Sequence, residues 1–165
     1  MEYAWHCATP LGGVTLASDG ETLTGLWFDG QRFFGGEPNA GRMEKALPVF
    51  DEASRWLEVY FSGRAPDFAP PLAPRGTPFR IAVWRELLTV PYGETVTYGQ
   101  LAARLGLGRS SARAVGGAVG HNPISLIIPC HRVIGADGSL TGYAGGTERK
   151  EKLLLLENPE YRIKS

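Results

Sequence analysis

The residues best suited to chemistry in this sequence are Cys130 and its neighbours, in the run Pro129-Cys130-His131-Arg132. A thiol becomes a nucleophile when a cation, a helix N-terminus or a proton acceptor stabilises its thiolate. His131 and Arg132 supply a base and a cation, but adjacent side chains of an extended strand point to opposite faces. Any coupling of Cys130 to His131 would therefore be bent or bridged by water. The alternative is an inert cysteine that fills the core.

Glu157 is a candidate for the group that orients the histidine. It ends the last predicted helix, and a carboxylate that holds the imidazole completes the arrangement of nucleophile, base and orienting residue. An isolated glutamate is also commonly solvated at the surface. The sequence by itself leaves both interpretations open.

The second cysteine, Cys7, lies far from Cys130 in the sequence, and no CxxC pair is present. This spacing predicts neither a disulfide framework nor a cysteine-rich zinc site, and it fits a reducing compartment. His6 and Cys7 side by side do not make four zinc ligands, so we expect no metal. We expect Cys7 to be a small core residue on the first strand.

Composition predicts a folded protein, and its uneven charge makes the C-terminal half the candidate for meeting an anion. The chain has 165 residues, 43% of them hydrophobic, and a formal net charge of zero. Residues up to Arg75 include 6 Lys or Arg and 10 Asp or Glu, whereas from Thr77 onward the numbers are 11 and 7. No apolar stretch is long enough to span a membrane, and the first residues lack a signal-peptide pattern. We expect a soluble, cytoplasmic protein.

The N-terminal part predicts a small sheet covered by one helix. Residues 3–8, 13–17 and 23–28 are rich in strand-forming residues and separated by turn signals, which is typical of an antiparallel meander. Residues 44–61 carry apolar side chains at helical spacing, and Pro48 is tolerable there only within the first turn. Residues 62–78 contain five prolines and predict a stiff connector. We place a domain boundary near Arg75.

The C-terminal part predicts mostly short helices. Thr77 and Pro78 are typical of a helix cap and first position, and that helix must end before Pro91. Residues 97–105 and 110–119, joined by a glycine-containing turn, predict a helix-turn-helix. The apolar run 124–128 predicts a buried strand that leads into Cys130, residues 135–138 predict a turn, and Thr147 is the expected cap of a helix over 148–157. The class expected for the whole chain is α+β.

The second of these paired helices, residues 110–119, is built almost entirely from small side chains. Small residues let a backbone approach another surface very closely. That surface is either DNA or a neighbouring helix, and the pattern does not choose between them.

The C-terminal half carries an ordered set of motifs: Val90-Pro91-Tyr92-Gly93, Thr97-Tyr98, Ala112-Arg113-Ala114-Val115-Gly116-Gly117, Gly120-His121-Asn122-Pro123, Pro129-Cys130-His131-Arg132-Val133 and Gly142-Tyr143-Ala144-Gly145-Gly146. This set, at matching intervals, resembles the signature of the O6-alkylguanine-DNA alkyltransferases. The N-terminal part is similar to the family only in size and strand pattern. The resemblance implies a ribonuclease H-like domain over 1–75 and a winged-helix-like domain with the helix-turn-helix over 76–165.

The resemblance also implies an activity, direct repair of O6-alkylguanine in DNA, with one alkyl group transferred to Cys130 and the protein spent by the reaction. His131 would act as a base through a bound water, Glu157 would hold His131, and Asn122 would brace the site. No metal or other cofactor is implied. Activity on O4-alkylthymine and the preferred size of the alkyl group stay open.

The same resemblance implies a role for each residue that meets the substrate. Double-stranded DNA would be bound through its minor groove by a monomer, the damaged guanine would be flipped out, and Arg113 would fill the gap. Tyr98 would donate a hydrogen bond to the flipped base. The remaining expected contacts are to the pocket, from Val133, Tyr143, Ala144 and Lys150, and to the DNA, from Ala112, Gly116, Arg104 and Arg109.

Three other functions compete with this one. A non-catalytic relative that only binds alkylguanine would have lost the cysteine, which is present here as Cys130. A transcription regulator would use the helix-turn-helix with an effector module, and none is evident. A cysteine hydrolase brings together a cysteine and a histidine that are distant in sequence, unlike the adjacent pair Cys130 and His131.

Overall fold

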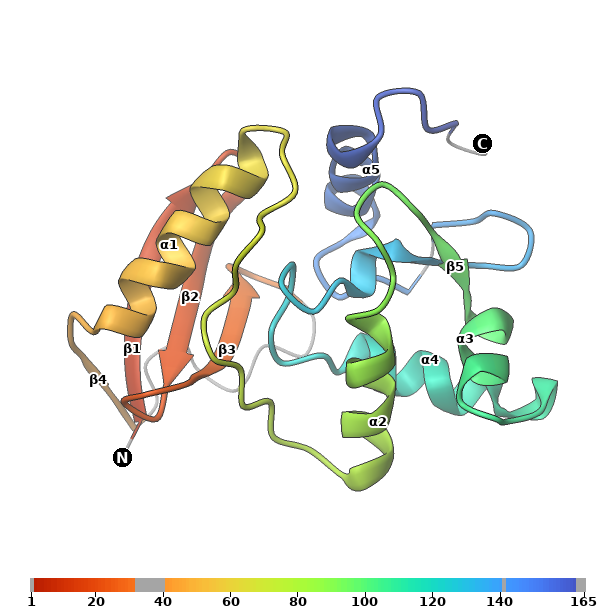
Figure 1. Ribbon diagram of the computed structural model, residues 1–165, viewed down its shortest axis with the longest axis horizontal. Helices are drawn as coiled ribbons and strands as arrows, with labels where there is room; N and C mark the ends of the chain where they lie inside the picture. The colour runs from red at the N-terminus through yellow and green to blue at the C-terminus, as the bar shows by residue number, and fades with distance from the viewer. Residues whose placement is uncertain (1, 32–40, 141, 163–165) are drawn as a thin grey trace. The chain divides into compact units, whose positions relative to one another are not determined.

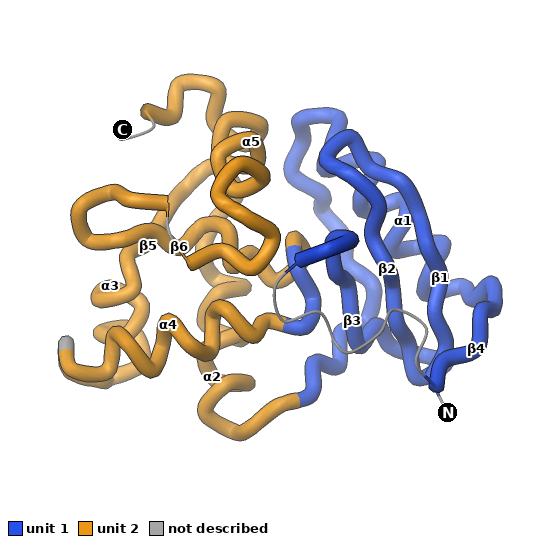
Figure 2. The backbone as a smooth tube through the Cα atoms, turned by 180° about the vertical axis from the view of Figure 1, so that it is seen from behind, with its two compact units in different colours: residues 1–75, 123–125 blue, residues 76–122, 126–165 orange. Residues whose placement is uncertain are grey.

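The computed structural model describes residues 2–31, 41–140 and 142–162 (Figure 1). They divide into two compact units, one of residues 1–75 with 123–125 and the other of residues 76–122 with 126–165, coloured separately in Figure 2. Each unit is described by itself. The short segment Pro123–Ser125 joins the first unit because its backbone pairs with Leu26, whose N–H donates to the Pro123 carbonyl at 2.9 Å.

The first unit is a four-stranded sheet with one helix. Its strands are β1 (Glu2–Thr9), β2 (Gly12–Ser18), β3 (Leu23–Phe28) and β4 (Arg42–Glu44), in the order β3-β2-β1-β4. The three predicted strands form the expected antiparallel meander. A fourth strand that the sequence did not predict, β4, runs parallel to β1 at one edge. Three residues carry too short a pattern to predict a strand.

Helix α1 (Pro48–Phe61) lies across β1, β2 and β3 (Figure 1). It begins at Pro48 rather than at the predicted Glu44. Pro48 fits the first helical turn, whereas the residue before a proline disfavours helical angles, and Leu47 is extended with φ −131° and ψ 149°. The buried face of the helix is apolar and packs on the sheet through Phe50, Trp56, Leu57 and Tyr60.

The second unit contains four helices in its described residues: α2 (Pro78–Leu87), α3 (Tyr98–Arg104), α4 (Ala112–Gly120) and α5 (Thr147–Glu157). The Thr77 hydroxyl accepts from the Arg80 N–H, which confirms the predicted cap of α2. Thr97 and Gln100 form a capping box that starts α3. Helices α2, α3 and α4 pack against one another, and a 3-10 turn, η1 (Arg109–Ser111), precedes α4. The short strands β5 (Val96–Thr97) and β6 (Val133–Ile134) pair in parallel.

Two predictions for the second half of the chain are wrong. The apolar run 124–128 is buried but is not a strand: Ile124 makes a single bridge with Leu26, and Leu126 has a left-handed φ of 71°, which breaks any extended run. The last helix is capped by Gly146, not by Thr147, which is its first helical residue. Gly146 has φ 95°, a conformation that glycine adopts without steric strain.

None of the helices formed by the described residues has both the length and the apolar character needed to cross a lipid bilayer.

Candidate active site

Cys130 is the first residue of a 3-10 turn, η2 (Cys130–Arg132), and not part of a strand. Its thiol is free and only 4% exposed. Because a 3-10 turn has about three residues per turn, the opposite-face argument for consecutive strand residues does not apply to Cys130 and His131. The turn therefore presents three consecutive polar side chains to the interior of the second unit, where Cys130, His131 and Arg132 are all buried.

Asn122 ties the nucleophile segment together. Its side-chain amide donates to the Ile128 carbonyl at 2.8 Å and also hydrogen-bonds the Cys130 thiol. Burial raises the pKa of Cys130, and the Asn122 hydrogen bond and the nearby charge of Lys150 offset only part of that effect. The buried thiol is therefore protonated at neutral pH, so it needs a proton acceptor before it can react as a nucleophile.

His131 and Glu157 form a buried pair, which the sequence suggested but did not decide. The His131 Nε2 atom lies 2.5 Å from the Glu157 Oε2 atom, and both side chains are almost fully excluded from solvent. Burial lowers the pKa of His131, while the hydrogen bond and charge of Glu157 act in the opposite direction. The neutral imidazole can accept a proton at Nδ1, and the carboxylate stabilises the cation that results.

Glu157 is held as a carboxylate despite its burial. Loss of water raises its pKa, but hydrogen bonds and positive charge from His131 and Arg132 outweigh that effect and hold the pKa well below its usual range. The Arg132 Nε atom donates to Glu157 Oε1 at 2.8 Å. The sequence suggested Arg132 as a cation beside the thiol, whereas in the structure its partner is the Glu157 carboxylate.

Lys150 is buried on α5 with no exposed surface. Its Nζ atom donates to the Val133 carbonyl. Burial lowers the pKa of Lys150 to about 8, with an opposing contribution from Cys130. The expected pocket residues Val133 and Lys150 are thus joined directly.

Tyr143 lies next to the catalytic candidates, and Ala144 after it is half-buried. The Tyr143 ring meets the His131 ring edge to face, with centroids 6.5 Å apart. The Tyr143 hydroxyl is buried and makes no hydrogen bond with any residue that the structure describes. Burial and the Cys130 charge raise the Tyr143 pKa well above its usual value, so the phenol stays a proton donor.

Tyr98 is the first residue of α3 and faces the same region. Burial raises its pKa, as does the charge of Cys130. Gly142 makes room for it, because a Cβ atom there would lie 2.8 Å from the Tyr98 hydroxyl. A Cβ atom on Gly116 would lie 3.6 Å from the Tyr98 ring, which is an ordinary contact. Tyr98 and Ala112 also line a hollow of about 700 Å³ between α3, α4 and Ala136.

The residues expected to meet DNA lie on α3 and α4 or in the turn between them. Arg113 is exposed on α4, Ala112 and Gly116 are half-buried on the same helix, and Arg104 is exposed at the end of α3. The side chain of Arg109, on the turn before α4, is outside the described part of the structure. Arg104 lies on α3 with Tyr98, and the other described residues of this set lie on α4, which packs against α3. The sequence alone left α4 equally suited to internal packing.

Two family models match the chain. The model described as 6-O-methylguanine DNA methyltransferase, ribonuclease-like domain, matches residues 3–74, and the model of the DNA binding domain of the same family matches residues 78–159. The chain belongs to the 6-O-methylguanine DNA methyltransferase family. The resemblance and the α+β class inferred from the sequence are thereby confirmed.

Relatives of this methyltransferase chain include methylated-DNA--protein-cysteine methyltransferases of archaea and bacteria. The Methanosarcina barkeri protein is 55% identical over 155 residues, 93% of this chain and 96% of the relative. The Mycobacterium tuberculosis protein is 48% identical over 149 residues, 90% and 88% of the two chains. The crystal structure of the Mycobacterium tuberculosis O6-methylguanine methyltransferase has a TM-score of 0.86 at 43% identity, with 99% and 97% coverage.

A further crystal structure of the Mycobacterium tuberculosis protein is of its complex with DNA. It has a TM-score of 0.86 to this methyltransferase at 44% identity and covers 95% of this chain and 93% of that one.

Cys7 differs from its expected place in the core. It lies on β1, is half-buried, and lines a hollow of about 540 Å³ beside α1. Burial raises its pKa, and a hydrogen bond with Ser54 offsets this in part. Among residues 2–31, 41–140 and 142–162, no three His, Cys, Asp or Glu side chains lie close enough to hold a metal ion.

Proposed function

We propose that Cys130 is the residue that accepts the alkyl group. As a member of the 6-O-methylguanine DNA methyltransferase family, the chain repairs alkylated guanine directly, by transfer of the alkyl group to a cysteine. The observation that carries the choice of Cys130 is its place in one 3-10 turn with His131, which is paired with Glu157. Cys7 lies in the other unit, on strand β1, where the adjacent histidine, His6, pairs with Asp29 and points to the opposite face of the sheet.

The proton of the thiol goes to His131 in the proposed reaction. Because burial keeps the thiol protonated, the imidazole removes the proton through a bound water as the sulfur attacks. Glu157 accepts from Nε2, which leaves Nδ1 as the atom that takes the proton, and the carboxylate then stabilises the imidazolium. Asn122 holds the segment that carries the thiol.

The electron pair of the broken bond goes to the guanine oxygen. The sulfur forms a bond to the alkyl carbon as the bond from that carbon to O6 breaks, and the guanine then takes up a proton. Tyr98 and Tyr143 keep their protons and are the candidate donors to the departing base. In the loop after Tyr143, the Gly146 N–H already donates to the Tyr143 carbonyl, so Ala144 and Gly145 are the backbone donors that remain candidates.

The product is a thioether, which is not a leaving group, so one chain repairs one lesion. The thiol and the lesion supply every atom and electron of the transfer, and we propose no metal or other cofactor. Lys150, Val133, Tyr143 and Ala144 shape the pocket in this scheme.

The chain binds DNA, as the family's DNA binding domain and the solved complex of a relative indicate. We propose that double-stranded DNA lies with its minor groove against α4, whose Ala112 and Gly116 permit close approach. Arg113 enters the stack and offsets part of the few kcal/mol needed to flip the damaged base. Arg104 and Arg109 contact phosphates, which adds affinity without sequence preference.

A stoichiometric transfer assay tests the proposal. Duplex DNA with one O6-methylguanine is incubated with the wild type, with Cys130→Ser and with the matched control Cys7→Ser, and each protein is digested and weighed by mass spectrometry. We expect one methyl group on Cys130 in the wild type and in Cys7→Ser, and none in Cys130→Ser. A methyl group on Cys7, or more than one repaired base per chain, overturns the proposal. A binding protein without catalysis would gain no methyl group.

The remaining expectations stay predictions. We expect a monomer that works in the cytoplasm. Light scattering of the protein alone and on a short duplex measures the number of copies. Alkylthymine in the same assay measures whether that base is a second substrate.

A further inference from the structure

Arg132 joins the catalytic turn to two other parts of the second unit. Its Nε atom donates to Glu157 Oε1 at 2.8 Å and its Nη2 atom to Glu157 Oε2 at 3.2 Å, which is a bidentate contact from one edge of the guanidinium. Its Nη1 atom donates to the Val90 carbonyl at 2.8 Å. The side chain is only 10% exposed, so these bonds form away from bulk water.

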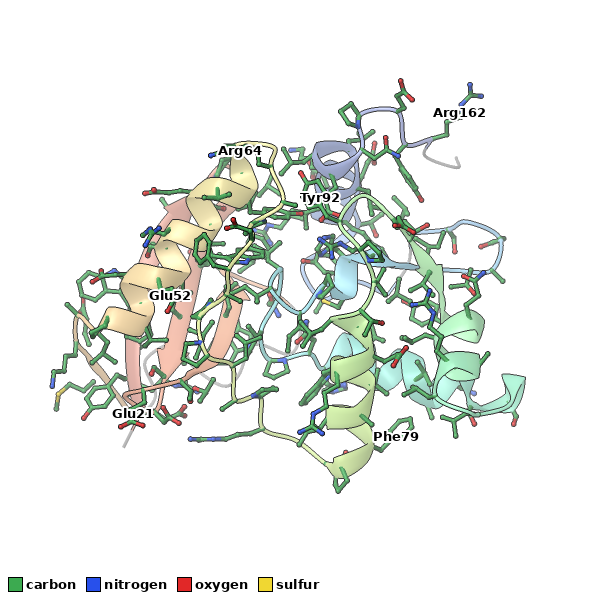
Figure 3. The ribbon with its side chains drawn as sticks, in the orientation of Figure 1. Glu21, Glu52, Arg64, Phe79, Tyr92 and Arg162 are labelled. Carbon is green, nitrogen blue, oxygen red and sulfur yellow. The ribbon has the colours of Figure 1, made fainter. Side chains whose placement is uncertain are left out.

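The loop between α2 and β5 completes the contacts of the carboxylate. The Gly93 N–H donates to Glu157 Oε1 at 3.0 Å. Tyr92, labelled in Figure 3, lies on the same loop, and its ring centroid is 5.7 Å from the Arg132 guanidinium carbon. Gly93 has φ 83°, and a Cβ atom there would lie 3.4 Å from the Glu157 carbonyl, so glycine suits this close approach.

The two oxygens of the Glu157 carboxylate have different hydrogen-bond partners. Oε1 accepts from Arg132 and Gly93, whereas Oε2 accepts from Arg132 and faces His131. A carboxylate has about four acceptor sites, and these donors occupy them. Rotation of the carboxylate away from His131 would break at least three hydrogen bonds in a buried place, where unmade bonds are costly.

We propose that Arg132 is a positioning residue of the transfer reaction, which acts through Glu157 by keeping the carboxylate ionised and aimed at His131. The inference rests on the proposed roles of Cys130 and His131. Arg132 touches neither the thiol nor the substrate in this scheme. Its effect is on how readily His131 takes up the proton of the thiol.

The charge of Arg132 gives this role a signature in the pH profile. The groups that face the His131–Glu157 pair are Arg132 on the same turn, Lys150 on α5, and the two neutral phenols Tyr92 and Tyr143. Arg132 lowers the pKa of both members of the pair, and a guanidinium does not titrate. Without its charge the pair binds a proton at higher pH, so the acid limb of the transfer rate moves to higher pH.

The experiment compares Arg132→Met, which removes the charge, with Arg132→Lys, which keeps it but loses the bidentate geometry. Single-turnover methyl transfer to Cys130 is measured between about pH 5 and pH 9, the range in which a histidine base titrates. We expect Arg132→Met to move the acid limb upward by about one pH unit, a tenfold change in the ionised fraction. We expect Arg132→Lys to lower the plateau rate while the limb stays within about 0.3 pH units of wild type.

A double-mutant cycle asks whether Arg132 acts through Glu157. Glu157→Gln removes the charge that Arg132 holds, so adding Arg132→Met to it should slow the reaction less than about twofold further. Arg42→Met is the matched control, because Arg42 is 12% exposed, pairs with Glu2 and lies in the other unit. We expect the control to keep the wild-type rate and acid limb.

The inference is overturned if the acid limb of Arg132→Met does not move. It is also overturned if the rate losses of Arg132→Met and Glu157→Gln multiply in the double variant. If Arg132→Met does not fold, the cycle is measured with Arg132→Lys and its double variant with Glu157→Gln. The inference is then overturned if the rate losses of the two single variants multiply in the double variant. If the wild type is methylated on Cys130 and the Arg132 variants react like the wild type, only the positioning role is refuted. If the methyl group is found on another residue, the proposed function itself is refuted.

Discussion

Replacement of Lys150 by methionine is expected to stabilise the protein at neutral pH. Lys150 has no exposed surface, and its ammonium group donates to the Val133 carbonyl. Burial lowers its pKa from 10.5 to about 8, so the folded state binds this proton less tightly than the unfolded state does. Methionine has a similar volume and keeps the buried stem without the charge.

The magnitude follows from the two pKa values. Below about pH 8 the amine is charged in both states, and the difference between 10.5 and about 8 corresponds to about 3 kcal/mol against folding. Above about pH 10.5 the amine is neutral in both states and this penalty is absent. The lost hydrogen bond to Val133 removes about 1 to 1.5 kcal/mol of the gain. The net stabilisation is about 2 kcal/mol at pH 7 and reverses sign between about pH 9 and pH 10.

Urea unfolding of both proteins at about pH 7, 9 and 10 measures this difference, because other titrating groups are common to the two chains. Lys152→Met is the control, since Lys152 is 56% exposed on the same helix and pairs with Glu148 at 3.2 Å. Its effect should stay within about 0.5 kcal/mol at every pH. A Lys150→Met protein that is less stable at pH 7, or whose stabilisation does not change with pH, would refute the reasoning.

Three further predictions follow from the same unit. Asn122→Ala leaves the buried Ile128 carbonyl without this donor and should lower the free energy of unfolding by about 1 to 3 kcal/mol in urea, and a loss below 0.5 would contradict it. Methylation of Cys130 adds a group to a packed site and should cost about 1 to 3 kcal/mol, whereas equal melting temperatures before and after transfer would argue against it. Gly93→Ala at φ 83° should cost about 1 to 2 kcal/mol, with Gly99→Ala, which has no such angle, as the harmless control.

Local patterns predicted the elements whose signals are local. The first three strands were found because turns bound them and their side chains are of strand-forming types. The start of α2 was found because Thr77 and Pro78 act within one turn of the chain. The signals for these elements lie within a few neighbouring residues, so the elements can be recognised without knowledge of the rest of the fold.

Elements that depend on distant partners were missed. Strand β4 forms because its backbone pairs with β1 at the edge of the sheet. The run 124–128 is apolar because it is buried, and it is not extended. The partners of Arg132 were not visible in the sequence, because Glu157 lies 25 residues after it and Val90 lies 42 residues before it. Only folding brings such groups within hydrogen-bond distance.

The order of residues around Cys130 was sufficient to determine the family and the kind of reaction, since a thiol beside a histidine within that motif set is specific. The protonation states of Cys130, His131, Lys150 and Glu157 were decided by the tertiary structure alone. A pKa depends on burial and on which charges and donors lie within a few ångströms. Neither quantity exists along a chain until distant segments have packed together.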